Sequence, residues 1–116
     1  MSVRIYHNSR CSKSRGTLEL LQARGIEPEV VNYLDTPPSV DELEALLRLL
    51  GMTPRQLLRT GEAEYTALGL DDPSVDDEAI LQAMVAHPRL IERPIVVANG
   101  KAAIGRPPEA VLPILP

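Results

Sequence analysis

Hydrophobic and polar residues follow strand-like patterns at the two ends of the chain and helix-like patterns between them. Near the N-terminus, the β-branched and aromatic run SVRIYH predicts a strand, and PEVVNYL, residues 28–34, predicts a second. Between them, Leu18, Leu21 and Ala23 recur at helical spacing and a glycine follows, so we expect a helix that begins near residues 12–14. A crossover of this kind usually joins two parallel strands in a right-handed sense.

The middle of the chain is predicted to be helical. Ser39, with Glu42 three residues later, has the pattern of a capping box, and a stripe of leucines follows it. Residues 53–54, a threonine and a proline, predict the start of a short helix, and EAEYTALGL is expected to add one or two helical turns. Ser74 is predicted to cap a further helix that stops at residues 87–88.

The strand-like pattern returns near the C-terminus. The runs PIVVA and KAAI predict two strands, and Asn99-Gly100 between them is typical of a two-residue hairpin, so we expect this pair to be antiparallel. The segment GRPPEAVLPIL predicts a short closing helix. The order β-α-β, helices, β-β-α indicates one α/β domain over residues 1–116, with a mixed four-stranded sheet and a helical insertion at about residues 39–88.

Composition and charge exclude several classes of protein. The net charge is −4, which argues against general nucleic-acid binding because such proteins need a basic surface. No apolar run approaches 18 residues, so we expect no membrane span, and the N-terminus lacks the apolar core of a signal peptide. A single cysteine cannot form an internal disulfide, which is typical of a protein from the reducing cytoplasm.

That cysteine, Cys11, stands among His7, Arg10, Lys13 and Arg15 in the stretch IYHNSRCSKSRG. Cations and a helix N-terminus lower the pKa of a thiol and raise its thiolate fraction, and the same groups select bound oxyanions. A lone cysteine is often a small buried side chain, and the charges could be only a solvated face. The polar neighbours nevertheless favour a reactive, accessible thiol.

Ser14 stands three positions after Cys11, where a dithiol oxidoreductase has its second cysteine. Because one thiol cannot make and break an internal disulfide, any redox cycle at Cys11 must recruit an external thiol such as glutathione. Two histidines in the whole chain are too few for an expected zinc site, so we expect no metal.

Three arginines far from the cysteine, Arg59, Arg93 and Arg106, lie at predicted element boundaries, where functional groups tend to gather. A guanidinium can donate two hydrogen bonds at once to a tetrahedral oxyanion. The alternative is that each is a surface arginine with a carboxylate partner, and the sequence does not show whether the three converge. Pro94 opens a predicted strand and is a candidate for a cis peptide bond.

Five blocks of the chain, IYHNSRCSKSRGTLELL, YLDTPPS, LLRTGEAEY, HPRLIERPIVV and GRPPEAVL, resemble the glutathione- and glutaredoxin-dependent arsenate reductase family in order and spacing. The resemblance implies a thioredoxin-like fold with a helical insertion. It also implies that Cys11 is the nucleophile that attacks arsenate, with His7 and Ser14 supporting its thiolate. Pro94 matches the cis proline of that fold. The residues implied to bind the oxyanion are Arg59, Arg93 and Arg106.

The resemblance further implies that a covalent adduct of arsenate on Cys11 is resolved by glutathione and glutaredoxin, which releases arsenite. Glutathione is then a co-substrate, and no bound cofactor is expected. Two alternatives stay open. The chain could be a regulatory adaptor that binds a protein through its helical insertion, or a monothiol, glutathione-linked oxidoreductase with another substrate. The adaptor needs neither Cys11 nor the arginines, whereas the monothiol enzyme needs Cys11 alone.

Overall fold

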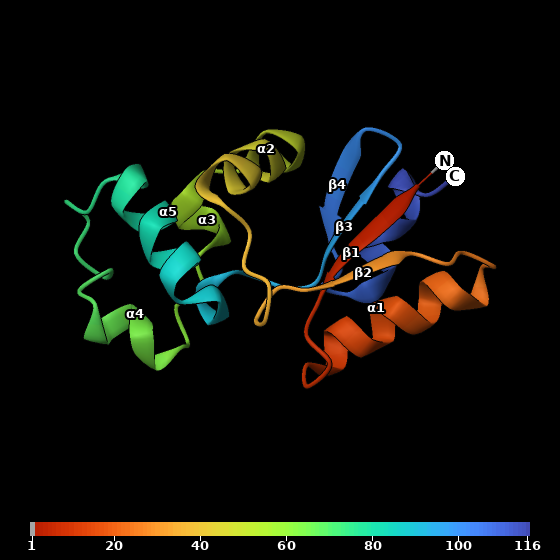
Figure 1. The fold of residues 1–116 in the computed structure, drawn as a ribbon, viewed down its shortest axis with the longest axis horizontal. Helices are drawn as coiled ribbons and strands as arrows, with labels where there is room; N and C mark the ends of the chain where they lie inside the picture. The colour runs from red at the N-terminus through yellow and green to blue at the C-terminus, as the bar shows by residue number, and fades with distance from the viewer. Residues whose placement is uncertain (1) are drawn as a thin grey trace. The chain divides into compact units, whose positions relative to one another are not determined.

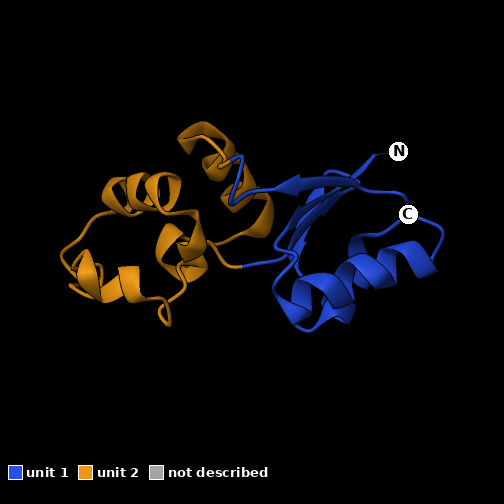
Figure 2. Cartoon of the chain, turned by 60° about the horizontal axis from the view of Figure 1, so that its bottom comes forward, with its two compact units in different colours: residues 1–36, 93–116 blue, residues 37–92 orange. Residues whose placement is uncertain are grey.

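The structure is a computed structural model that describes residues 2–116, and these divide into two compact units (Figure 2). Unit 1 comprises residues 2–36 and 93–116, and unit 2 comprises residues 37–92. Unit 2 therefore corresponds, within a few residues at each end, to the helical insertion expected over residues 39–88.

Unit 1 is built on a mixed four-stranded sheet in the order β2-β1-β3-β4 (Figure 1). Its strands are β1 Val3–His7, β2 Glu29–Asn32, β3 Ile95–Ala98 and β4 Lys101–Ile104. Strand β2 runs parallel to β1, while β3 is antiparallel to both β1 and β4. The predicted fold class, a mixed α/β sheet assembled as β-α-β and β-β-α, is confirmed.

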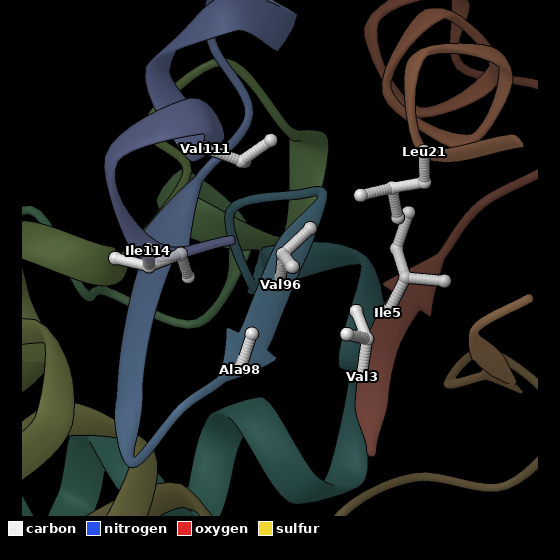
Figure 3. Close-up of a cluster of buried hydrophobic side chains, with 7 residues drawn as sticks. All are labelled: Val3, Ile5, Leu21, Val96, Ala98, Val111 and Ile114. Atoms are coloured by element: carbon white, nitrogen blue, oxygen red, sulfur yellow. The ribbon is translucent and has the colours of Figure 1, made fainter. Parts of the chain in front are cut away.

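Two helical segments complete unit 1: α1, Ser12–Ala23, and the 3₁₀ segment η2, Pro108–Ile114. Alternate residues of a strand face the same side of the sheet, so β1 and β3 each present two apolar side chains to these helices. Figure 3 shows the resulting core, in which Leu21 from α1 is fully buried. The buried members of this cluster are Val3, Ile5, Leu21, Val96, Ala98, Val111 and Ile114.

The predicted hairpin is present between β3 and β4. Asn99 and Gly100 both have positive φ, 60° and 70°, which is the backbone that a two-residue turn of the primed type requires. Asparagine and glycine tolerate this conformation better than other residues, so the local sequence fixes the antiparallel register of the pair.

Unit 2 is helical, as predicted. Its segments are α2 Val40–Leu50, α3 Pro54–Leu57, α4 Ala63–Ala67, α5 Asp77–Ala86 and the 3₁₀ turn η1 Pro88–Leu90. The hydroxyl of Ser39 accepts a hydrogen bond from the N–H of Glu42 at 3.1 Å, and Thr53 forms a full capping box with Gln56. None of the helices in residues 2–116 is both long enough and apolar enough to cross a membrane.

The predicted cap at Ser74 is wrong. Asp76 caps α5 instead, because its carboxylate accepts from the N–H of Ala79 at 2.9 Å. Ser74 is engaged two residues upstream, where its N–H and its hydroxyl both donate to Oδ1 of Asp72, at 2.9 and 2.8 Å. A carboxylate is at least as good an N-cap as a hydroxyl, so Asp76, directly before Asp77, sets the start of α5.

Candidate active site

Cys11 is the N-cap residue of α1, with an extended backbone at φ −94° and ψ 123°. Its N–H donates to the carbonyl of Asn8, and its own carbonyl accepts from the N–H of Arg15, both at 3.0 Å. The thiol is partly exposed and belongs to no disulfide. Cys11 therefore lies at the N-terminal end of a 12-residue helix, where unpaired N–H groups and the positive end of the helix dipole meet.

The pKa of the Cys11 thiol lies below its usual range. Partial burial raises this pKa, but the backbone N–H groups of Ser14 and Lys13, together with the guanidinium of Arg93, lower it and outweigh the effect of burial. All three groups stabilise the charged form of the sulfur. The thiolate fraction at neutral pH is consequently higher than for an ordinary cysteine, which favours nucleophilic chemistry.

Two of the three candidate arginines, Arg93 and Arg106, meet at this thiol. Nη1 of Arg106 lies 3.8 Å from Sγ of Cys11 and donates to the carbonyl of Arg93 at 3.2 Å. Each of these arginines precedes a proline, and both the Arg93–Pro94 and the Arg106–Pro107 peptide bonds are cis. Two guanidinium groups beside a thiolate make a place where an oxyanion can bind close to the sulfur.

His7 and Ser14 are bonded to each other and are both buried. Ser14 Oγ lies 2.6 Å from Nδ1 of His7, and it accepts from the N–H of Asn8 at 3.0 Å. Burial lowers the pKa of His7, and the nearby charge of Arg15 lowers it further, so the ring is neutral at neutral pH. Ser14 thus acts on the sulfur of Cys11 through its backbone N–H, while its side chain fixes the first turn of α1 against β1.

This arrangement predicts a pH effect on stability. His7 has a lower pKa in the folded protein than in the unfolded chain, so the unfolded chain binds more protons as the pH falls through the usual range of histidine. The free energy of unfolding should therefore decrease between pH 7.5 and pH 5, and His7→Gln should remove part of that decrease. Urea unfolding at the two pH values measures it, with His87→Gln, at the only other histidine, as the control. Parent and His7→Gln curves that fall by the same amount would contradict the role given to burial of His7.

Arg59 belongs to unit 2, and its contacts lie within that unit. Its guanidinium forms ion pairs with Glu92, at 2.6 Å, and with Glu62, at 3.4 Å. The sequence left open whether each of the three arginines pairs with a carboxylate. Arg59 pairs with two. Its role as an oxyanion ligand stays a prediction.

The sequence analysis did not identify three residues of the site: Asn8, Thr17 and Gly105. Asn8 shapes the loop before Cys11, since its carbonyl, its N–H and its side-chain Oδ1 all form hydrogen bonds, the last with the N–H of Arg10 at 3.0 Å. The hydroxyl of Thr17, fully buried on α1, donates to the carbonyl of Lys13 at 2.8 Å. The position of Asn8 between a predicted strand and a predicted helix is only a weak sign of a role in the site. No pattern in the sequence pointed to Thr17.

Gly105 has no room for a side chain. Its N–H donates to the carbonyl of Pro94 at 2.9 Å, and a Cβ there would stand 2.8 Å from Cγ of Pro94 and still closer to Oγ1 of Thr17. This close approach brings the turn that carries Arg106 against α1 and Pro94. The only sign of Gly105 in the sequence is that a glycine stands directly before Arg106, and its meaning is clear only once the packing is known.

Gly105→Ala should therefore destabilise the protein by about 1–3 kcal/mol, the usual cost of forcing an extra group into a packed site. The matched control is Gly61→Ala, because nothing lies within 4 Å of a Cβ built at Gly61. That substitution should change stability by less than about 0.5 kcal/mol. Urea unfolding compares the two, and equal effects would show that Gly105 is not tightly enclosed.

A thiol at the start of α1 and a mixed sheet in the order β2-β1-β3-β4 are features of a thioredoxin-like fold. The sequence model of the ArsC family matches residues 6–114, so the chain belongs to the ArsC family. It is 52% identical over 114 residues to an arsenate reductase of Neisseria meningitidis serogroup A, covering 97% of each chain. It is 60% identical over 114 residues to the uncharacterized protein YfgD of Escherichia coli strain K12, covering 97% of this chain and 96% of that one.

The structure agrees with this assignment. It superimposes on the solved structure of an arsenate reductase from Vibrio cholerae with a TM-score of 0.96, at 55% sequence identity, covering 99% of this chain and 98% of that one. The thioredoxin-like fold and the arsenate reductase family, both expected from the resemblance of the five sequence blocks, are confirmed. Within residues 2–116, no group of three or more histidine, cysteine, aspartate or glutamate side chains is placed to hold a metal ion.

Proposed function

We propose that this protein reduces arsenate to arsenite, with Cys11 as the nucleophile and with glutathione and glutaredoxin as the source of electrons. The observation that carries the proposal is the position of Arg106, whose Nη1 lies 3.8 Å from a sulfur with a lowered pKa. A thiolate that only exchanged disulfides would have no need of two arginines beside it. Membership of the ArsC family, and relatives named arsenate reductases, support an oxyanion as the substrate.

The first proposed step forms a covalent adduct. Arsenate binds between Arg93 and Arg106, and the thiolate of Cys11 attacks arsenic and forms an S–As bond. One As–O bond breaks, and its oxygen leaves as water after protonation. The two guanidinium groups stabilise the negative oxygens on arsenic, and they do so most while charge builds up in the transition state.

The later steps supply two electrons. The thiol of glutathione displaces a second oxygen of the adduct as water, which gives an arsenic atom bonded to two sulfurs. A glutaredoxin thiolate then attacks the glutathione sulfur, so a mixed disulfide leaves and its S–As electron pair remains on arsenic. Arsenic is thereby reduced from the +5 to the +3 state, and hydrolysis of the remaining S–As bond frees arsenite and Cys11. A supply of glutathione implies that the reaction takes place in the cytoplasm.

A coupled assay tests the proposal. Arsenate should drive NADPH consumption when the protein, glutathione, glutaredoxin and glutathione reductase are all present, and omission of any one of them should stop it. Absence of turnover, in a preparation whose Cys11 still reacts rapidly with a thiol reagent at neutral pH, would reject arsenate as the substrate. That outcome would favour the monothiol alternative, a glutathione-linked oxidoreductase with another substrate. Slow reaction at Cys11 as well would favour the adaptor alternative.

A further inference from the structure

Thr17 lies where α1 meets the turn that follows β4. Its side chain is fully buried, and its hydroxyl faces two backbone carbonyls, that of Lys13 at 2.8 Å and that of Gly105 at 3.4 Å. A hydroxyl has one hydrogen, so the two carbonyls share it. The contact with Lys13 lies within α1, whereas the contact with Gly105 joins residues 88 positions apart. Thr17 therefore connects the helix that begins beside Cys11 to a distant segment of unit 1.

The turn after β4 is also attached to the segment before β3. The N–H of Gly105 donates to the carbonyl of Pro94 at 2.9 Å, and Nη1 of Arg106 donates to the carbonyl of Arg93 at 3.2 Å. The same nitrogen of Arg106 lies 3.8 Å from Sγ of Cys11. Because Gly105 directly precedes Arg106, a shift of Gly105 relative to α1 also moves this guanidinium relative to the sulfur.

Apolar packing brings α1 and η2 together but gives their contact no direction. Leu21 of α1 and Val111 of η2 belong to the same buried cluster (Figure 3). Hydrophobic contact is non-directional, whereas a hydrogen bond weakens steeply with distance and angle. The hydroxyl of Thr17 adds a directional contact between the helix and the turn. Helix propensity does not explain a threonine here, because alanine and leucine are better helix formers.

The contact between Thr17 and Gly105 needs an explanation beyond the helix itself. A helical threonine commonly donates to the carbonyl four residues earlier, which accounts for the contact with Lys13 alone. A Cβ built at Gly105 would meet both Oγ1 and Cγ2 of Thr17, the latter at 3.1 Å, so the turn lies directly against this side chain. With a methyl group in place of the hydroxyl, the carbonyl of Gly105 would face a group that donates no hydrogen bond, which favours a shift of the turn.

We propose that Thr17 is a positioning residue whose hydroxyl holds the turn that carries Arg106 at its distance from the sulfur of Cys11. The inference deepens the proposed function, and it rests on the place given there to Arg106 beside the thiolate. All the groups involved lie in unit 1. Loss of the hydroxyl should leave a folded protein in which the positive charge of Arg106 is less well placed at the sulfur.

The charge beside the sulfur can be measured without arsenate. Iodoacetamide is neutral and iodoacetate is an anion, and in both reactions the thiolate of Cys11 forms an S–C bond and displaces iodide. The ratio of the two alkylation rates, iodoacetate to iodoacetamide, cancels the thiolate fraction and reports the positive charge near the sulfur. Cys11 is the only cysteine of the chain, so both rates belong to one atom.

Thr17→Val keeps the shape of the side chain and removes the hydroxyl. We expect it to lower this ratio about twofold to fivefold, because full withdrawal of one unit charge from about 4 Å in water corresponds to roughly fivefold. Thr17→Ser keeps the hydroxyl and should retain the ratio of the parent, although loss of a buried methyl group should lower its stability in urea unfolding. Thr36→Val, the same substitution at an exposed threonine of unit 1, is the matched control and should leave the ratio unchanged.

A double-mutant cycle tests whether the effect passes through Arg106. In an Arg106→Gln background, Thr17→Val should have no further effect on the ratio. An equal fall in both backgrounds would overturn the inference. So would a ratio that Thr17→Val leaves unchanged, or one that Thr17→Ser lowers as much as Thr17→Val. If Thr17→Val does not fold, Thr17→Ala and Thr17→Ser give the same comparison, because their side chains differ only in the hydroxyl.

Failure of the inference can be distinguished from failure of the proposed function. If Arg106→Gln lowers the ratio but Thr17→Val does not, only the role of Thr17 is rejected. If Arg106→Gln itself leaves the ratio unchanged, the proposed place of Arg106 at the sulfur is rejected, and the inference with it. A lack of arsenate turnover, together with the expected ratios, would reject the substrate and leave the inference standing.

Discussion

Cys11→Ser is expected to abolish arsenate-dependent turnover and to leave the fold intact. A serine hydroxyl has almost no ionised fraction at neutral pH, so the groups that stabilise the thiolate of Cys11 have no equivalent nucleophile to act on. Loss of a nucleophile that acts with its surroundings as a unit typically costs more than about a thousandfold in rate. The coupled NADPH assay measures the loss, and circular dichroism and urea unfolding test the fold.

Ser9→Ala is the matched control for this experiment. Ser9 is exposed two residues before Cys11, and only its backbone carbonyl, which accepts from Arg15 at 3.0 Å, has a described contact. This variant should retain the activity of the parent. A Cys11→Ser protein with the parent's spectrum and the parent's activity would remove Cys11 from the mechanism.

Arg93→Ala is expected to have the second largest effect, and on two properties at once. It should weaken sulfate and arsenate binding by about 1.5–3 kcal/mol, the range for a lost hydrogen bond to a charged group, or roughly 10- to 150-fold. It should also raise the pKa of Cys11, because the guanidinium of Arg93 helps to keep that pKa low. Titration calorimetry gives the affinities, and the pH dependence of alkylation gives the pKa.

Arg24→Ala removes the same charge at the opposite end of α1, where Arg24 is exposed as the C-cap residue. It should change neither the anion affinity nor the pKa of Cys11 appreciably, since exposed charges more than about 10 Å apart are largely screened. If Arg93→Ala behaved like Arg24→Ala in calorimetry, Arg93 would not be an oxyanion ligand. A changed pKa with unchanged affinity would limit its role to the thiolate.

Local patterns predicted the parts of the fold that depend on neighbouring residues. The hairpin followed from Asn99-Gly100, and the cap of α2 followed from Ser39 three residues before Glu42. The start of α5 was predicted wrongly because Ser74 and Asp76 both suit an N-cap, and the hydrogen bonds between Ser74 and Asp72 decided between them. Sequence patterns alone do not rank two such competing interactions.

The candidate site was predictable in its chemistry but not in its geometry. The polar residues around Cys11 favoured a reactive, accessible thiol, and in the structure this thiol is partly exposed and its pKa is lowered by backbone N–H groups and Arg93. The approach of Arg106 to Cys11 joins residues 95 positions apart, and it depends on the close contact at Gly105, which no local pattern reveals. The pairing of Arg59 with Glu92 likewise required the bridge between two distant segments of unit 2.

The rate at which iodoacetamide alkylates Cys11 measures directly whether this cysteine is a stabilised thiolate beside an oxyanion site. Cys11 is the only cysteine of the chain, so the measured rate belongs to one sulfur. We expect an apparent pKa below that of a free thiol, about 8.5, and a saturable decrease of the alkylation rate as arsenate is added. A pKa at or above that of a free thiol, together with a rate that arsenate does not change, would contradict it.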